Sequence, residues 1–292
     1  MSDIKIIPVI FLLLVIFIIY SVNDKLTQRF AVIKNVTNDH SIAFDSVSQL
    51  ECKALKIPTD HIPWDDEEYN TIIIPINYIY VSDRRLRPIN SNKVESIRQM
   101  TITLTDKLNK SFDGYIEFER IDFITFVNFQ YNILDIYNNY VYGNKSHFKY
   151  LVTDNAKANT FNVFIIENSN VTLNDSDIML GFTPVLENKF NFYESTSPEL
   201  DNVFVSFDGL FEYDLGVTLI HETGHWFGLA HPFELSDEEK KRFGLVTKYN
   251  VCINFMNYNC FIDEFTKEQL EYAYKFAKNN RKYLIKNLDN SN

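Results

Sequence analysis

The chain has 292 residues, of which 46% are hydrophobic and 15% aromatic, enough for one large or two modest domains with a substantial core. Its formal net charge is −11. This charge argues against nucleic acid as a partner, because phosphate binding requires clustered Lys and Arg side chains.

The first distinct segment is an apolar run at residues 6–20, IIPVIFLLLVIFIIY. The run is long for the core of a signal peptide and short for a membrane-spanning helix of about 20 residues. No small-x-small cleavage site follows it, and its Lys and Arg flanks are too evenly balanced to predict an orientation. We expect residues 1–23 to be an uncleaved membrane anchor or a cleaved signal peptide, with a buried core strand as the remaining alternative. Anchor and signal peptide both place the chain in the secretory pathway, secreted or membrane-anchored, outside the cytosol.

The next segment, residues 24–66, is polar and mixed and has no strong hydrophobic period. It contains Pro58 and Pro63 and runs into an acidic stretch at residues 65–68. We expect a linker or a pro-segment here, followed by one folded domain over residues 67–292.

From there onward, strand patterns alternate with helix patterns. Runs of β-branched and aromatic residues predict strands, and apolar residues three or four positions apart predict helices. The alternation implies an α/β fold with a largely parallel sheet covered by helices. Pro184 restricts the fourth strand to an edge, where an extended peptide could add as a further strand. The expected strands span residues 71–81, 115–127, 161–167, 178–186 and 203–207, and the expected helices span residues 90–108 and 131–142.

The most informative stretch is residues 221–231, HETGHWFGLAH, which fits the pattern H-E-x-x-H-x-x-G-x-x-H. Half of the six His in the chain fall inside it. Chance would place this pattern in a chain of this composition with a probability of about 10⁻⁵. Asp214 is a suitable N-cap, so we expect a helix over residues 215–227 that carries the first part of the motif.

Three His in this motif are candidate metal ligands. His221 and His225 are four apart, so on a helix they lie on the same face one turn apart. On a continued helix, His231 would lie about 15 Å along the axis from His221, too far to share a metal ion. We therefore expect the chain to reverse at Gly228, in a left-handed conformation that ends the helix. Three neutral His with one open position are typical of a catalytic zinc site, because a structural site has a fourth protein ligand.

Glu222 follows the first of these His and points beside their common face. We expect its carboxylate to reach a water held by the metal without being a ligand itself. The alternative is an exposed helix that carries two His by coincidence. That alternative explains neither Gly228 nor His231.

Beyond the motif, residues 232–250 form a polar connection to the stretch NFMNYNC at residues 254–260. Thr266 and Gln269 then make a capping box that begins a C-terminal helix. The apolar stripe of this helix, which we expect to pack under the site, contains Leu270, Ala273, Tyr274, Ala277, Leu284 and Leu288.

The chain contains three Cys. Cys252 and Cys260 flank a short loop, which predicts one disulfide in an oxidising compartment. Cys52 is then left over. Its thiolate could occupy the open position of the zinc and hold an enzyme latent, although an idle Cys is the more frequent outcome.

The His motif, followed by Met256 in N-x-M-x-Y, resembles the metzincin clan of zinc endopeptidases. Within the clan, the chain is most similar to the pappalysin-type family. The matching pieces lie between residues 160 and 275. They are Leu180-Gly181-Phe182, the stretch 221–233 with Gly-His-Trp and Leu-x-His-x-Phe, and Asn254-x-Met256-x-Tyr258 with Cys260, Phe265-Thr266 and Gln269.

The resemblance implies a metzincin-like α/β (α+β) domain over residues 67–292. Such a domain has a twisted, mostly parallel five-stranded sheet with an antiparallel edge strand, a zinc-site helix, a Met-turn and a C-terminal helix. The implied site residues are the Zn²⁺ ligands His221, His225 and His231, the general base Glu222, the Met-turn residue Met256 beneath the metal, and Tyr258 as a catalytic residue that is either a switch or an oxyanion-stabilising phenol.

We therefore expect a zinc-dependent endopeptidase that hydrolyses peptide bonds in protein or peptide substrates, with Glu222 as general base. A second hypothesis is a catalytically inactive, zinc-stabilised binding module at the membrane or cell surface, against which an intact Glu222 argues. The third is a non-enzymatic anchored structural protein, which metal analysis would distinguish from the other two.

Overall fold

The structure is a computed structural model in which all described residues belong to one compact unit within Leu50–Asn292. The expectations for residues 1–23 and 24–66, including Cys52, lie outside the described residues. None of the described helices is long and apolar enough to cross a membrane. The described residues are 69–82, 91–121, 124–167, 180–184, 201–207, 216–257 and 264–286.

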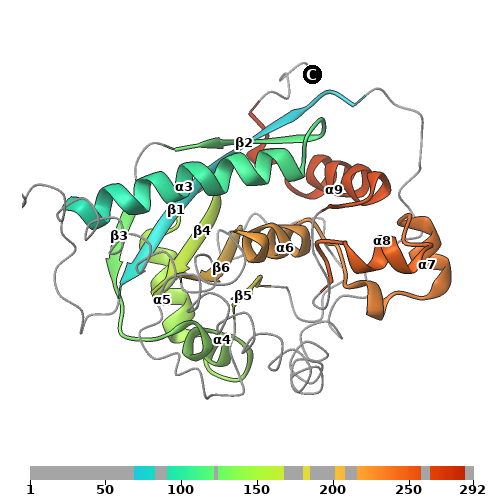
Figure 1. Ribbon diagram of the computed structural model, residues 1–292. Helices are drawn as coiled ribbons and strands as arrows, with labels where there is room; N and C mark the ends of the chain where they lie inside the picture. The colour runs from blue at the N-terminus through green and yellow to red at the C-terminus, as the bar shows by residue number, and fades with distance from the viewer. Residues whose placement is uncertain are drawn as a thin grey trace, which may run out of the picture. The chain divides into compact units, whose positions relative to one another are not determined.

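A mostly parallel sheet forms the centre of this unit. Its described strands are β1 (Ile72–Ser82), β2 (Ile116–Arg120), β3 (Thr125–Asn128), β4 (Phe161–Ile166), β5 (Gly181–Phe182) and β6 (Asn202–Ser206). The strand order is β2-β1-β4-β6-β5, and β3 is a further partner of β1 (Figure 1). β5 runs antiparallel to β6, whereas the other described pairs are parallel. The predicted α/β class and the antiparallel edge strand are confirmed.

Within the described residues the sheet has six strands rather than the expected five, because the strand expected over residues 115–127 is divided in two. β2 pairs with β1 so that Ile116 lies opposite Ile72, and β3 pairs with β1 so that Thr125 lies opposite Ile79. The difference in residue number between paired residues is 44 for β2 (116 − 72) and 46 for β3 (125 − 79). Side chains alternate between the two faces of a sheet, so a register shift of two residues leaves the same side chains on each face. The break between β2 and β3 therefore does not change the hydrophobic pattern and could not be predicted from it.

Helices cover both faces of the sheet, as the alternation of strands and helices predicts (Figure 1). The helices α3 (Ser91–Ser111) and α6 (Val217–Trp226) share one buried cluster with Ile74, Ile76 and Tyr78 of β1. The helices α4 (Ile133–Val141) and α5 (Ser146–Asn155) share the other with Ile79 and Val81 of the same strand. β1 is therefore buried on both faces, which explains its nearly continuous apolar sequence.

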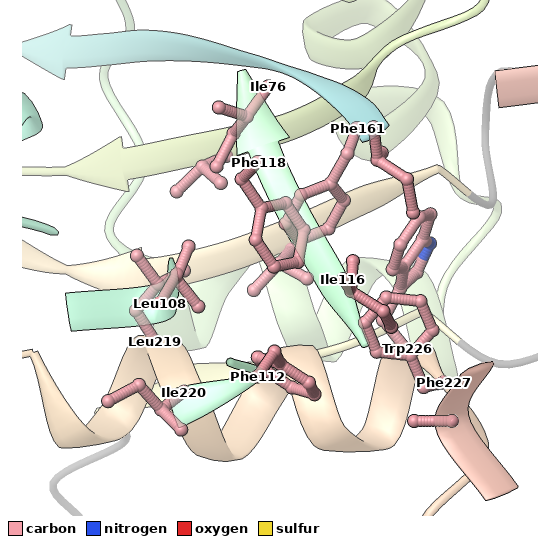
Figure 2. Close-up of a cluster of buried hydrophobic side chains, with 14 of the residues drawn as sticks. Ile76, Leu108, Phe112, Ile116, Phe118, Phe161, Leu219, Ile220, Trp226 and Phe227 are labelled. Atoms are coloured by element: carbon pink, nitrogen blue, oxygen red, sulfur yellow. The ribbon is translucent and has the colours of Figure 1, made fainter. Parts of the chain in front are cut away.

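The first of these clusters holds α6, the helix that carries His221 and His225, against the sheet, as Figure 2 shows. Trp226 is 2% exposed, and its ring stacks on Phe161 of β4 with 4.2 Å between ring centroids. The ring centroid of Phe227 lies 5.4 Å from that of Phe112, which directly follows α3. This packing keeps α6 in a fixed position beside the edge strand β5.

Other helices differ from the expectations. α5 was not expected, because its sequence is mostly polar and it buries only Phe148, Leu151 and Val152. The connection over residues 232–250 contains a 3₁₀ turn (Pro232–Glu234) and the short helices α7 (Asp237–Arg242) and α8 (Lys248–Cys252).

The C-terminal helix α9 (Lys267–Asn280) begins at the predicted capping box. It ends before Leu284, which lies in a separate 3₁₀ turn, and the expected Leu288 lies outside the described residues. The prediction that Leu284 continues the apolar stripe of this helix was therefore wrong, and the prediction for Leu288 is not tested.

A buried ionic contact joins the C-terminal end of α9 to the sheet. Arg281 Nε lies 3.4 Å from Asp201 Oδ1, with the two side chains 12% and 4% exposed. Tyr283 donates a hydrogen bond of 2.7 Å to Asp201 Oδ2. Burial raises the pKa of Asp201, and this effect outweighs the opposite effects of Arg281 and Tyr283. The guanidinium of Arg281 also lies 5.1 Å from the ring of Trp226.

We expect Arg281→Ala to lower the free energy of unfolding by about 3 kcal/mol, because it leaves the buried Asp201 carboxylate without its cation. Chemical denaturation measures this change. The matched control is Lys286→Ala, which removes an exposed ion pair with Glu119 and should cost less than about 0.5 kcal/mol. Equal decreases in the free energy of unfolding for the two variants would show that the buried ion pair contributes no more than the exposed one.

Candidate metal centre

The helix α6 begins two residues later than expected, at Val217, with Gly216 as its N-cap. Gly216 has φ of +101°, which L-residues with side chains rarely adopt. A Cβ on Gly216 would also lie 2.8 Å from Leu104 Cδ2 of α3. The predicted cap, Asp214, lies outside the described residues. Close packing against α3 therefore places a glycine where sequence rules favour a polar cap.

The helix ends at the predicted glycine. Gly228 has φ of +80°, and the Leu229 amide donates to the Gly224 carbonyl oxygen at 2.9 Å. The chain then turns back instead of continuing along the helix axis. As a result His231 Nε2 lies 3.1 Å from His221 Nε2 and 3.0 Å from His225 Nε2, and the latter two nitrogens are 3.1 Å apart.

The other ring nitrogen of each His faces an oxygen that can only accept a hydrogen bond in its usual charge state. His221 Nδ1 lies 2.7 Å from the Phe255 carbonyl oxygen, and His225 Nδ1 lies 2.8 Å from the Leu229 carbonyl oxygen. His231 Nδ1 lies 3.2 Å from Glu234 Oε2. In each neutral ring the proton is therefore on Nδ1, and Nε2 carries a lone pair.

Burial keeps these rings neutral. It lowers the pKa of His221 to about 4, with the Phe255 carbonyl acting in the opposite direction. Burial also lowers the pKa values of His225 and His231 well below the usual range, and neighbouring His rings add to the effect. Neutral imidazole is the form that binds a metal ion.

Three lone pairs that face one another across about 3 Å repel, and none of the three Nε2 atoms has a proton to share. A cation between them removes this repulsion. Four-coordinate zinc with Zn–N bonds of about 2.0–2.1 Å places its nitrogen ligands about 3.3 Å apart, close to the separations observed here. Among the described residues, these three His are the group that converges on a possible metal position. The donor set thus fits a zinc ion.

Glu222 lies one residue after the first His and is not part of this converging group. It is only 7% exposed. Thr183 Oγ1, just beyond β5, lies 2.9 Å from Glu222 Oε2 and 2.8 Å from the Glu222 carbonyl oxygen, so it can donate to either. The Glu222 carboxylate, on the helix that carries two of the three His, therefore has a donor from the edge of the sheet.

Met256, which the resemblance places beneath the metal, packs against α6 at Gly224. It is fully buried, and a Cβ on Gly224 would overlap its Sδ atom. The turn that carries Met256 is held by Asn254, whose side chain accepts a hydrogen bond from the Met256 amide at 3.1 Å. Asn254 also makes two side-chain hydrogen bonds with Gln269 of α9, at 2.6 and 3.1 Å. The carbonyl of Phe255 in the same turn accepts from His221, so this turn orients the first ligand.

Several residues of the prediction are not described. Tyr258 and Cys260 lie outside the described residues, and the side chain of Cys252 is not described either. The catalytic phenol and the disulfide thus stay predictions.

Other contributors were missed from the sequence. Thr183 carries no local signal, because its partner Glu222 is 39 residues away. Gly181 was noted only as part of Leu180-Gly181-Phe182, without its close approach to Glu222. A usable signal existed for Glu234, since H-x-x-E after the His motif is a spacing at which a carboxylate can reach back. Gln269 was predicted only for its capping box, and its two hydrogen bonds with Asn254, 15 residues away, had no local signal.

The chain matches no known protein family and no curated protein. One similar solved structure is described as "Structure of a chaperone-substrate complex". Its chain is 10% identical in sequence to this one, with a TM-score of 0.37. The match covers 72% of this chain and 35% of that chain, so this protein spans about a third of its length. A similarity this weak carries no argument about function, which must therefore come from the site.

We expect Glu234→Ala to weaken zinc binding by about 10–100-fold, because the carboxylate that orients His231 is lost. Competition with a chromophoric chelator measures the dissociation constant. His231→Ala should weaken binding further, since it removes a ligand itself. Glu238→Ala, on the exposed surface of α7, is the control. A dissociation constant for Glu234→Ala equal to that of Glu238→Ala would show that the ring needs no such support.

We also expect Gly224→Ala to destabilise the protein by about 1–2 kcal/mol, because its Cβ overlaps Met256 Sδ in a fully buried contact. In a Met256→Ala background the same change should be neutral or stabilising, since Ala is the better helix former by about 1 kcal/mol. Thermal unfolding of the four proteins tests this reversal of sign. The same sign in both backgrounds would contradict the packing argument.

Proposed function

We propose that this chain is a zinc-dependent endopeptidase of the metzincin type, most similar to the pappalysin-type family. One observation carries the proposal: the Nε2 atoms of His221, His225 and His231 meet within 3.1 Å of one another, while each Nδ1 faces an acceptor. Such a cluster needs a cation. Three protein ligands leave a tetrahedral ion one open position, as catalysis requires.

When bound, zinc lowers the pKa of the water that it holds to about 7 and polarises a carbonyl oxygen. The protein supplies the proton transfer. In this proposal the Glu222 carboxylate accepts a proton from the attacking water and passes it to the nitrogen of the leaving amine. Tyr258 is proposed as a donor to the oxyanion, a role typically worth about 3 kcal/mol.

The position of the edge strand supports a peptide as substrate. β5 is the last strand in the sheet order, and it packs against the helix α6 that carries the His motif. An extended peptide that adds to such an edge forms main-chain hydrogen bonds with it. This arrangement would bring a scissile bond beside Glu222. Zinc is the proposed cofactor, and the secretory route with a membrane anchor or signal peptide belongs to the same proposal.

We expect Glu222→Gln to bind zinc as tightly as the wild type and to hydrolyse peptides at least about 100-fold more slowly, because the amide cannot accept the proton. Mass spectrometry of a peptide library incubated with the zinc-loaded protein measures hydrolysis, and a chelator-treated sample is the control. Undiminished turnover would end the assignment of Glu222. A wild type that binds zinc but cleaves no peptide would favour the inactive binding module.

A further inference from the structure

The edge segment at residues 180–184 divides its side chains between two neighbours. Phe182 is 2% exposed and stacks on Phe204 of β6, with ring centroids 4.7 Å apart and planes 4° apart. It belongs to the cluster that α4 and α5 cover. Because side chains alternate along a strand, Gly181 and Thr183 lie on the opposite face, toward α6.

Both of these residues contact the side chain of Glu222. A Cβ on Gly181 would lie 2.8 Å from Glu222 Cγ and 3.1 Å from Glu222 Oε1, so only glycine allows the carboxylate to lie this close to the strand. Thr183 Oγ1 lies 2.9 Å from Glu222 Oε2. The face of the edge segment toward α6 therefore holds the carboxylate in two ways. Gly181 leaves space for it, and Thr183 donates a hydrogen bond to it.

This contact matters because a glutamate has three rotatable side-chain bonds and can adopt several staggered rotamers, only some of which direct the carboxylate to one place. A displacement of about 1 Å in a reacting group can cost about 100-fold in rate. Hydrogen bonds to a charged group are also stronger than those between neutral groups. The Thr183 hydroxyl has one hydrogen, and the Glu222 carbonyl oxygen at 2.8 Å competes for it.

We propose that Thr183 is a positioning residue that holds the Glu222 carboxylate through Oε2, so that the edge of the sheet places the general base. This inference rests on the proposed peptidase function. Its consequence is that the sheet edge on which a peptide would align also orients the group that moves the proton. A shift of this edge would therefore change substrate alignment and the placement of the base together.

The test compares two substitutions in the full chain loaded with zinc. Thr183→Val keeps the shape and removes the hydroxyl, whereas Thr183→Ser keeps the hydroxyl. With a peptide that the wild type cleaves, we expect Thr183→Val to lower kcat by about tenfold or more, with KM changed by less than about threefold. Thr183→Ser should stay within about threefold of the wild type in both constants. Both variants should bind one zinc per chain.

A second measurement needs no activity. Thr183→Val is made in the wild type and in Glu222→Ala, and Tm is measured for all four proteins. We expect Thr183→Val to lower Tm more in the wild-type background. In Glu222→Ala the carboxylate is already absent, so the substitution removes only the hydrogen bond to the carbonyl oxygen of residue 222. Equal losses in the two backgrounds would show that Thr183 anchors the main chain and does not hold the carboxylate.

The outcomes separate this inference from the function on which it rests. A wild type that holds zinc but cleaves no peptide ends the proposed function and this inference with it. An active wild type with equal kcat for the Val and Ser variants ends only the inference. Loss of zinc from Thr183→Val would also overturn it, because the hydroxyl would then act on the metal site as a whole.

Discussion

The structure of this protein depends on one electrostatic constraint, which is that three imidazole lone pairs meet within about 3 Å. This arrangement is unfavourable without a cation, yet each ring is oriented by its own acceptor from a different part of the chain. Phe255 in the Met256 turn orients His221, Leu229 after the helix orients His225, and Glu234 orients His231. Such oriented donor atoms are characteristic of metal sites, where the surrounding residues set tautomer and direction.

The helix that carries two of these His is surrounded by close contacts that glycines permit. The missing Cβ of Gly216 leaves space for Leu104 of α3, and that of Gly224 leaves space for Met256. The missing Cβ of Gly181 in the edge strand leaves space for Glu222. Three of the neighbours of α6 therefore approach it more closely than a side chain would allow. Close approach on several sides restricts movement of the helix. A site that depends on a cluster of three nitrogens and one carboxylate requires this restriction.

Much of the framework could be predicted from local pattern. β-branched runs located β1, β4 and β6, and the capping box located the start of α9, because these signals act within one element. The reversal at Gly228 followed from the distance that His231 would otherwise have from His221. Predictions failed where packing between elements decided the outcome. The even shift between β2 and β3 leaves the side-chain pattern unchanged, and α5 forms on a mostly polar segment that packs against α4.

The amino-acid sequence by itself determined the identity and spacing of the three His and Glu222, since their pattern needs only helix geometry and one glycine stop. It also specified the α/β class and the edge position of the strand before Pro184, whereas the antiparallel direction of that strand was implied only by the family resemblance. The partners of these groups were decided only by folding. Thr183 reaches Glu222 over 39 residues, and Asn254 reaches Gln269 over 15, through hydrogen bonds that no local period encodes. Such contacts depend on how separate elements pack, and packing is a property of the whole domain.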